Sequence, residues 1–178
     1  MQNLTASHVS DRDEYLHFIS LESSLGFALT AVSPRGICAI LMGDTREELE
    51  RELRREFAAQ SPAYSDFGLE GIGAQTVRAI ETPQLGVSLP LDLQGTPLQI
   101  SVWQALQAIP IGETATYEEI PRRIGAPNAV DSVLQACLDN MIAVAIPCHR
   151  VMGNHGELGE YRWGWKRKGA LLDREAHR

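Results

Sequence analysis

A cysteine followed directly by a histidine and an arginine ends an apolar run in the stretch IAVAIPCHRV, residues 142–151. A thiol is an effective nucleophile only as the thiolate, so it needs a base or a positive charge nearby. Cys148 has His149 and Arg150 within two residues. The apolar run predicts a buried strand, and Pro147 predicts a sharp turn that would set the thiol at the floor of a cleft. The stretch favours nucleophilic chemistry, although an incidental Pro-Cys-His turn has the same letters.

The histidine needs help to act as the base for this thiol. Adjacent side chains of an extended segment point to opposite faces, so we expect a bridging water to carry the proton from Cys148 to His149. A base of this kind also needs a partner that fixes its tautomer. Glu175, in the terminal stretch RKGALLDREAHR, is the preferred partner and Asp173 the reserve. Arg150 is expected to lock the turn through a bidentate contact.

The other totals narrow the function. Cys38 and Cys137 are far from Cys148 in sequence and form no C-x-x-C pair, so we expect buried structural thiols, no disulfide framework and no zinc site. The chemistry requires no metal and no organic cofactor. A net charge of -7 gives no general attraction to polyanions, so a nucleic-acid partner would need basic residues gathered on one face. The stretch YRWGWKRK, residues 161–168, is such a gathering or a solvated helix start.

The chain also lacks the marks of a membrane or exported protein. It has no run of about 18 apolar residues and no charged-then-apolar leader, so we expect no membrane partner and a cytoplasmic location.

The first half of the chain alternates strand and helix signals. The stretches YLHFISLE, GFALTAVS and GICAILMG predict strands, with SPRG as a hairpin turn between the last two. DTREELERELRREF predicts an amphipathic helix capped by Thr45, and AQTVRAIETP predicts a second helix after the loop SPAYSDFGLEGIG. VSLPLDLQG predicts a strand that leaves the first domain. We therefore place domains at residues 1–94 and 95–178.

The second half predicts helices. TPLQISVWQALQAIPIG places Val102, Leu106 and Ile109 on one helical face. TYEEIPRRIG opens with the Thr116–Glu119 spacing of a capping box, and APNAVDSVLQACLDN follows with a proline suited to a first helical turn. The last two helices form a helix-turn-helix candidate, although most such pairs are ordinary packing.

These motifs together resemble one family. IPCHRV, with GETATYEEI and Asn140 upstream and YRWGWKRKGALLDREA downstream, resembles the O6-alkylguanine-DNA alkyltransferases, or methylated-DNA–protein-cysteine methyltransferases, in particular the C-terminal half of bacterial Ada proteins. SPRGICAILMGD and LPLDLQGTPLQISVWQALQAIPIGET extend the resemblance over essentially the whole chain. The resemblance implies an α/β fold, in which a ribonuclease-H-like N-terminal domain packs on a helical C-terminal domain with a helix-turn-helix.

The resemblance also implies a reaction. A monomer would enter the minor groove of double-stranded DNA, rotate an O6-alkylguanine out of the duplex and transfer the alkyl group irreversibly to its own cysteine. Each molecule would act once, because the thioether is stable and no second thiol is expected close enough to remove the group.

Roles follow residue by residue from the resemblance. Cys148 would accept the alkyl group, His149 would act as the water-mediated base, Glu175 would orient it, Asn140 would hold the turn, and Tyr117 would hydrogen-bond the departing guanine. Two further sets are implied. The substrate pocket would comprise Tyr161, Val151, Gly159 and Glu160, and the DNA-facing surface Asp131, Ser132, Gln135 and Tyr117.

The DNA-facing surface departs from the family pattern. Asp131 stands where the family places an arginine that inserts into the base stack, and Leu134 and Gln135 replace small residues. Asp131, Gln135 and Leu138 would share the DNA-facing side of the helix, with Asp139 as a second negative charge, so we expect weak DNA binding. Glu160 replaces a small pocket residue. Pro121 is expected to bend or shorten the first helix of the pair at a cost of ~3 kcal/mol.

Three alternatives remain open at this point. The altered surface resembles engineered self-labelling tags of this family that accept free benzylguanine-like substrates, and a diverged natural homologue would look the same. A non-catalytic DNA lesion-binding protein would keep the fold but needs no Cys148. A cysteine hydrolase would need an oxyanion hole, for which the sequence gives no signal.

Overall fold

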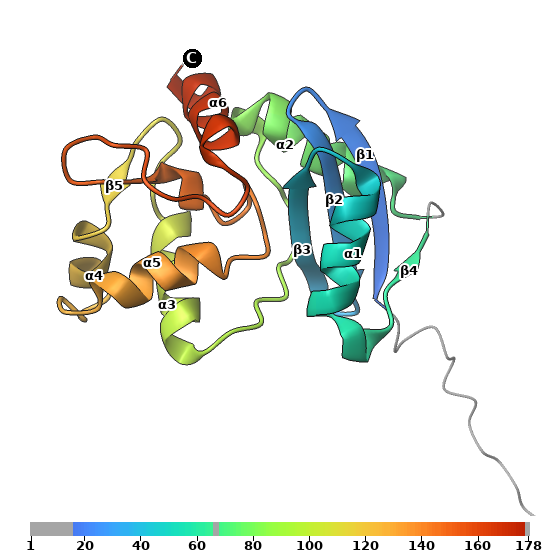
Figure 1. Ribbon diagram of the computed structural model, residues 1–178, viewed down its shortest axis with the longest axis horizontal. Coiled ribbons are helices and arrows are strands. Elements are labelled where there is room, and N and C mark those ends of the chain that lie inside the picture. The colour runs from blue at the N-terminus through green and yellow to red at the C-terminus, as the bar shows by residue number, and fades with distance from the viewer. Residues whose placement is uncertain (1–15, 66–67, 177–178) are drawn as a thin grey trace, which may run out of the picture.

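A four-stranded sheet forms the first part of the fold. The computed structural model describes residues 16–65 and 68–176, and Figure 1 sets the sheet on one side and a group of helices on the other. The strands are β1 (His17–Ser23), β2 (Gly26–Ser33), β3 (Gly36–Gly43) and β4 (Ala63–Tyr64), in the order β3-β2-β1-β4. β1, β2 and β3 are antiparallel neighbours, and β4 runs parallel to β1. The predicted strands and hairpin turn are confirmed, except that β1 begins at His17 and not at Leu16; Tyr15 lies outside the described residues.

Two helices cover opposite faces of this sheet. α1 (Arg46–Glu56) places Arg54 over the Phe18 ring, whereas α2 (Glu70–Glu81) sets Gly73 against Ile19, the next residue of β1. Successive strand residues point to opposite faces, so the sheet is buried on both sides. The predicted Thr45 cap is confirmed, since its hydroxyl accepts a hydrogen bond from the Glu48 amide at 3.3 Å.

α2 begins earlier than the sequence predicted. The loop expected over residues 61–73 is wrong from Glu70 onward, where the chain is already helical. Glycines are poor helix formers and obscured this start, but a Cβ at Gly73 would lie 2.8 Å from Leu21 Cδ1. The missing side chain lets α2 pack close to β1, and this contact outweighs the weak propensity.

The connection between the two parts is not a strand. The stretch 87–95 was predicted to be a strand. It makes only one isolated bridge, from Leu91 to Ile37, so that prediction is wrong. Its anchor is the buried Asp92 carboxylate, which accepts a hydrogen bond from Ser33 Oγ at 2.7 Å and pairs with Arg35 at 3.0 Å.

The second part is mainly helical. Its elements are α3 (Pro97–Gln107), β5 (Ala115–Thr116), α4 (Glu119–Arg123), α5 (Val130–Leu138), η4 (Cys148–Arg150), β6 (Val151–Met152) and α6 (Trp165–Ala176). β5 and β6 pair in parallel. Short 3-10 turns η2 (Ala58–Gln60) and η3 (Pro83–Leu85) belong to the first part. Within the described residues, no helix has the length and apolar character that a bilayer crossing needs.

The helix predicted over residues 116–125 is short, since α4 spans only Glu119–Arg123, but the expected loss of a helical hydrogen bond at Pro121 is not found. Pro121 is the third residue of α4, within the first turn, where a backbone N–H has no partner inside the helix. The predicted Thr116–Glu119 exchange is present, with Thr116 N donating to Glu119 Oε2 at 2.6 Å and Glu119 N donating to Thr116 Oγ1 at 3.2 Å. Pro127 precedes α5 by three residues, so its predicted place in the first turn is wrong.

The apolar run before Cys148 is a series of turns and not the predicted strand. Ile142 makes a bridge to Ile40 of β3, after which Val144 adopts a left-handed conformation with φ of 57°. Ile146 N then donates to the Ile142 carbonyl at 3.0 Å. Apolar β-branched residues favour strands, but the buried turns here are set by the side chain of Asn140.

Candidate active site around Cys148

The predicted nucleophile is buried at the start of η4. Cys148 is 1% exposed, and its Sγ accepts a hydrogen bond from Asn140 Nδ2 at 3.1 Å. Burial raises the pKa of the thiol well above its ordinary value, and a hydrogen bond with Cys137 adds to the rise. The Asn140 hydrogen bond and the nearby charge of Lys168 oppose it. The resting thiol is therefore protonated near neutral pH and needs a base.

His149 lies in a buried network with the predicted partner Glu175. Its Nε2 is 2.8 Å from Glu175 Oε1, and both side chains are 1% exposed. A carboxylate accepts, so Nε2 carries the proton and Nδ1 keeps a free lone pair. Nδ1 is buried and has no hydrogen-bond partner among the described residues. The ring is therefore held with its basic atom available to a proton donor.

Arg150 completes the network as the expected bidentate contact. Its Nε lies 2.9 Å from Glu175 Oε2, and its Nη2 lies 2.9 Å from Oε1. Its Nη1 donates to the Ile109 carbonyl at 2.6 Å, which ties η4 to the end of α3. Glu175 thus has a positive partner on one side and the imidazole on the other. Asp173, the reserve candidate, lies two residues earlier, on the exposed side of α6.

The surroundings of Glu175 and His149 decide which of the two carries a charge. Burial alone raises the pKa of Glu175, but hydrogen bonds and charge from His149 and Arg150 outweigh it and lower the value to about 2. Burial lowers the pKa of His149, and Arg150 and Lys168 add to this, while Glu175 opposes it. The network near neutral pH is an ionised glutamate beside a neutral histidine.

Asn140 holds the turn between α5 and η4. Its Oδ1 accepts from Ile142 N at 2.8 Å, while its Nδ2 contacts the Ile146 carbonyl at 3.1 Å and the Cys148 sulfur. One buried side chain therefore fixes the path of the turns and hydrogen-bonds the Cys148 sulfur. This placement agrees with the hinge position that was expected for it.

Tyr117 meets the predicted pocket loop. Its hydroxyl donates to the Glu160 carbonyl at 3.2 Å, so Glu160 uses its backbone here while its side chain is exposed. Gly159 has a φ of +65°, and a Cβ there would lie 3.1 Å from Tyr117 Cε2. Burial raises the pKa of Tyr117, so its hydroxyl remains a donor. A glycine is required where the loop passes the ring.

The remaining pocket residues surround a lysine that the sequence did not single out. Lys168 is fully buried; its Nζ donates to the Val151 carbonyl at 2.6 Å and to the Glu160 carbonyl at 3.3 Å. Burial lowers its pKa to about 8. Lys168, Leu171 and Glu175 share the buried face of α6, and a lysine at this spacing was the signal that could have revealed it.

Tyr161 lies beside the catalytic candidates. Its ring centroid is 6.3 Å from that of His149 at an interplanar angle of 81°, and its ring packs edge-on against Trp163. Tyr161 is buried, and its hydroxyl has no hydrogen-bond partner among the described residues. The Tyr161 hydroxyl is therefore a buried polar group close to His149.

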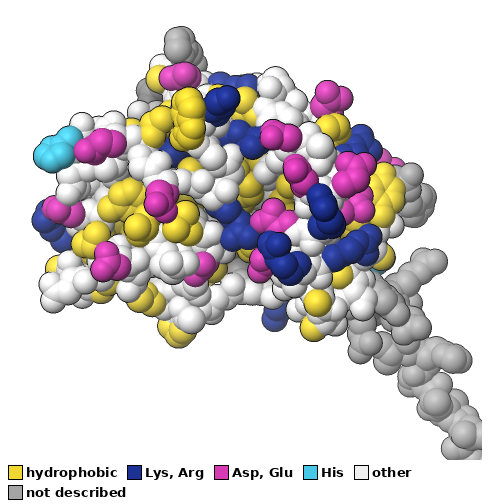
Figure 2. Space-filling view, viewed as in Figure 1, with side chains coloured by type: hydrophobic (Ala, Val, Ile, Leu, Met, Phe, Trp, Pro, Cys, Tyr) yellow, Lys and Arg dark blue, Asp and Glu magenta, His cyan; other side chains and the backbone are white. Residues whose placement is uncertain are grey.

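The expected DNA-facing residues lie apart from this network. Asp131, Ser132 and Gln135 are exposed on α5, whereas Leu138 is partly buried. Asp139 is held by two amides, Gln99 Nε2 at 2.8 Å and Gln135 Nε2 at 2.7 Å. Figure 2 shows acidic, apolar and neutral side chains over α5, a basic side chain at the edge near α4, and basic and acidic side chains together over α1. Arg122 and Arg123 of α4 are exposed. The exposed face of α5 has no evident attraction for a polyanion.

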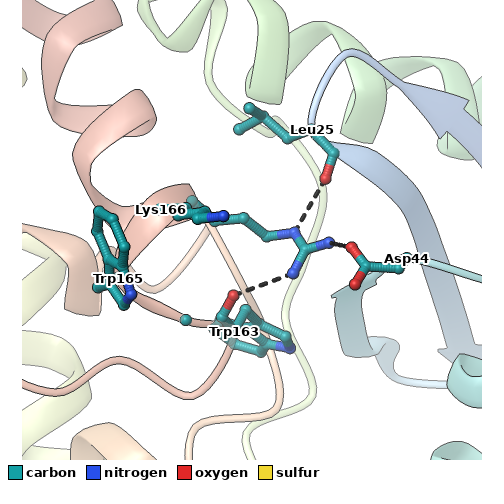
Figure 3. Close-up of a pocket in the computed structure, with 7 residues that line it drawn as sticks. Leu25, Asp44, Trp163, Trp165 and Lys166 are labelled. Carbon is teal, nitrogen blue, oxygen red and sulfur yellow. Dashed lines mark hydrogen bonds and ion pairs between the residues drawn. The ribbon is translucent and has the colours of Figure 1, made fainter.

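The basic stretch 161–168 does not form one surface. Arg167 lies in a cavity of about 380 Å³, where it donates to the Leu25 carbonyl at 2.9 Å and to the Trp163 carbonyl at 3.2 Å and pairs with Asp44 (Figure 3). Lys168 is buried, and Trp165 is 64% exposed with the Lys166 ammonium 5.8 Å from its ring. The stretch mainly ties α6 to the sheet.

The two other thiols differ in their surroundings. Cys38 is buried in β3, where burial raises its pKa to about 12 with a smaller contribution from Asp92. Cys137 is buried on α5, and its thiol adds to the raised pKa of Cys148.

Fold and site together define a mixed α/β protein with a buried cysteine followed by a buried histidine that pairs with a glutamate. A family model described as "6-O-methylguanine DNA methyltransferase, DNA binding domain" matches residues 97–177. The chain is 38% identical to the methylated-DNA–protein-cysteine methyltransferase of Mycobacterium leprae, over 91% of this chain and 93% of that protein. The chain therefore belongs to the methylated-DNA–protein-cysteine methyltransferase family.

Two further relatives refine this placement. The regulatory protein Ada of Salmonella typhimurium is 48% identical over 86% of this chain, which spans only 43% of the length of Ada. A crystal structure of Mycobacterium tuberculosis OGT in complex with DNA has 33% identity and a TM-score of 0.75, covering 90% of this chain and 92% of that one.

Proposed function

We propose that this protein transfers an alkyl group from O6-alkylguanine to Cys148 in a single turnover. The observation that carries the proposal is the buried network in which Glu175 binds both His149 and Arg150, next to a thiol held by Asn140. Such a network leaves a histidine neutral, oriented and ready to accept a proton. Its relatives carry the corresponding activity in their names.

The chemical step uses one proton and one bond exchange. His149 Nδ1 takes the thiol proton through a water, and the Cys148 thiolate attacks the alkyl carbon bound to O6 of the guanine. An S–C bond forms as the C–O bond breaks, so the electron pair remains on the guanine. Tyr117 donates a hydrogen bond to the departing base and limits the cost of its charge. The thioether is stable, which makes the protein its own final product.

The pocket supports recognition of a purine edge. The Val151 carbonyl and backbone groups near Cys148 are the proposed acceptors and donors, with Tyr161, Gly159 and Glu160 as the surrounding wall. Lys168 holds the Val151 carbonyl in the free protein, so it fixes where this acceptor points. The substrate must reach a thiol that is almost fully buried, which requires the pocket loop to move aside.

We extend the proposal to DNA. Residues 1–94 are proposed to form a ribonuclease-H-like domain, and residues 95–178 the alkyltransferase domain with α4 and α5 as a helix-turn-helix. α5 would meet the minor groove through Asp131, Ser132 and Gln135 while the damaged base is rotated out. The DNA-bound relative supports this use of the fold. A monomer acting in the cytoplasm suits this role.

DNA binding is proposed to be weak in this chain. Asp131 is exposed on the surface that would face phosphates, and an anion there removes a favourable contact and adds a repulsive one. A free O6-alkylguanine derivative does not meet this repulsion, so it is the proposed second substrate. The comparisons lend no support to an engineered origin or to a non-catalytic lesion-binding role.

Incubation with fluorescent O6-benzylguanine tests the proposal. We expect one covalent addition per molecule, mapped to Cys148 by peptide mass spectrometry, and none in Cys148→Ala. Cys38→Ala is the matched control, because Cys38 is buried in the sheet part, and it should label at the parent rate. Full labelling of Cys148→Ala, or repeated release of free product by unmodified protein as in a hydrolase, would refute the assignment.

A further inference from the structure

A cavity of about 320 Å³ lies between the two parts of the fold and reaches the Arg150–Glu175 pair. One wall belongs to the first part, at η3 and Val87, and the other to the end of α3 and the turns before Cys148. None of the residues proposed to bind the alkylguanine lines this cavity, and neither does Cys148 or His149. It is therefore separate from the substrate pocket, and we refer to it as the Arg150 cavity.

Arg150 brings unused hydrogen-bond donors to this cavity. An arginine side chain has five N–H groups and no acceptor. Among the described residues, its Nε and Nη2 donate to Glu175 and its Nη1 donates to the Ile109 carbonyl, which occupies three of the five. Two N–H groups remain, on a side chain that is only 9% exposed. A buried donor without a partner is costly, so these groups favour an acceptor in the cavity.

The rest of the cavity suits a small organic molecule. Val87, Val144 and Pro147 are among the apolar residues that line it, and Gln107 lies at its exposed rim. Its volume is near the lower end of the range for small-molecule sites, about 300–1,000 Å³. Val144 has a φ of 57°, which a β-branched residue rarely adopts, and strained backbone of this kind concentrates at ligand sites.

We propose that the Arg150 cavity binds a small uncharged molecule with an apolar body and one exposed carbonyl oxygen, of the class of aromatic carboxamides. The apolar walls would cover its body, and the carbonyl oxygen would accept from Arg150. A carboxylate fits less well, because Glu175 already balances the charge of Arg150 and a second anion would lack a countercharge. The alkyl transfer makes no use of this cavity, so the site goes beyond the proposed function.

The ligand and the alkylguanine could bind at the same time. Arg150 meets Glu175 through Nε and Nη2, and the ligand would take only the N–H groups that remain. His149 would keep its hydrogen bond to Glu175 Oε1. The alkylguanine would reach Cys148 past the pocket loop, whose residues do not line the cavity.

An NMR titration of the ¹⁵N-labelled full-length protein tests the inference. Benzamide is the probe, benzoate tests the effect of charge, and toluene lacks the carbonyl oxygen. We expect benzamide to shift the backbone signals of Val87 and Gln107 and the Nε signal of Arg150. It should bind at least about tenfold more tightly than either analogue, since each leaves a charge or a donor unpaired. Absence of these shifts, or an analogue that binds as tightly as benzamide, would overturn the inference.

A matched pair of variants tests the location. Gln104 and Gln107 are both exposed on α3, but only Gln107 lines the cavity. A tryptophan at the rim would cover the entrance, so Gln107→Trp should weaken benzamide binding severalfold, whereas Gln104→Trp should bind it as the parent does. Equal affinities in the two variants would contradict the location. Circular dichroism checks folding, and Val87→Trp, from the opposite wall, replaces Gln107→Trp if that variant does not fold.

A labelling experiment separates this site from the substrate pocket. Saturating benzamide should leave unchanged the concentration of fluorescent O6-benzylguanine that gives half-maximal labelling rate. A rise of this concentration in proportion to benzamide would place the probe in the substrate pocket and overturn the inference. The NMR titration does not depend on alkyl transfer, so failure of this inference is distinguishable from failure of the proposed function.

Discussion

The network around Cys148 and the exposed face of α5 are neighbours, but the side chains of the first are buried and those of the second are in contact with solvent. The side chains of the network have buried partners, and Glu175 has two of them, His149 and Arg150. Asp131, Ser132 and Gln135 are exposed on the helix. A substitution in the network leaves a buried charge or hydrogen-bond donor without its partner. A substitution on the exposed face of α5 alters mainly the electrostatic potential at that surface.

The difference separates chemistry from recognition within one small part of the fold. The reactive set is held by packing and by hydrogen bonds that also stabilise the protein, so its residues are costly to replace. The helix face can exchange charge without disturbing the core. Four predictions test this contrast.

The largest effect is expected for Glu175→Gln. The amide leaves Arg150 buried without a countercharge and no longer fixes the tautomer of His149. We expect a loss of about 3–5 kcal/mol in the free energy of unfolding, as for other broken buried ion pairs, with a steep fall in labelling rate. Urea unfolding and single-turnover labelling measure both. The exposed Glu113→Gln should change neither, and a Glu175→Gln protein of parent stability would contradict the contrast.

The acid dependence of stability follows from the same carboxylate. The pKa of Glu175 falls from 4.5 to about 2 on folding, so its stabilisation is present above pH 4.5 and lost as the pH falls toward 2. This shift corresponds to roughly 3 kcal/mol. The stability gap between the parent and Glu175→Gln should therefore close over this range. The lowered pKa of His149 gives a separate loss below about pH 6.5, because the unfolded histidine binds the proton first. A constant gap down to pH 2.5 in urea titrations would exclude the assignment.

A smaller effect, confined to binding, is expected on the helix face. Asp131→Arg should tighten binding to duplex DNA and steepen its salt dependence by about one in log–log slope, because one phosphate contact is added. Labelling with the free derivative should not change. Binding is measured by fluorescence anisotropy at several salt concentrations. Glu22→Arg is the control, because it makes the same charge change at an exposed position of β1. Equal gains in both variants would mean that net charge, and not this face, limits binding.

The smallest effect is expected at Pro121. Its place in the first turn of α4 means that Pro121→Ala restores no helical hydrogen bond, so thermal unfolding should change by less than about 1 kcal/mol. Gln104→Pro, in the interior of α3, should cost about 3 kcal/mol or more. A large stabilisation by Pro121→Ala would show that the proline does strain the helix pair.

The sequence predicted the secondary structure correctly where it depends on residues that are close together in the chain. β2 and β3 were predicted over their full ranges, and so was the Thr45 cap, because apolar alternation and capping depend on near neighbours. The start of α2 and the turns before Cys148 were missed. They depend on Gly73 packing on β1 and on the Asn140 side chain, which are contacts between distant residues.

The candidate site was likewise predicted where it depends on neighbouring residues and missed where it depends on distant ones. The order Cys148, His149 and Arg150 pointed to the nucleophile, and the choice of Glu175 over Asp173 agrees with the observed contact. Lys168 was missed, because its contact with the Val151 carbonyl depends on which face of α6 is buried. A single sequence gives residue spacing along a helix but not the partner that covers it.

The last helix has a consequence for attempts to exchange parts between relatives. α6 carries Glu175 at the thiol, while Arg174 donates to the Ile80 carbonyl at 2.6 Å and Arg167 reaches Leu25 of the sheet part. One helix therefore positions Glu175, the carboxylate bound to His149, from anchor points on the first part of the fold. Chimaeras that join the sheet of one homologue to the helices of another should inherit reactivity only when these anchors match.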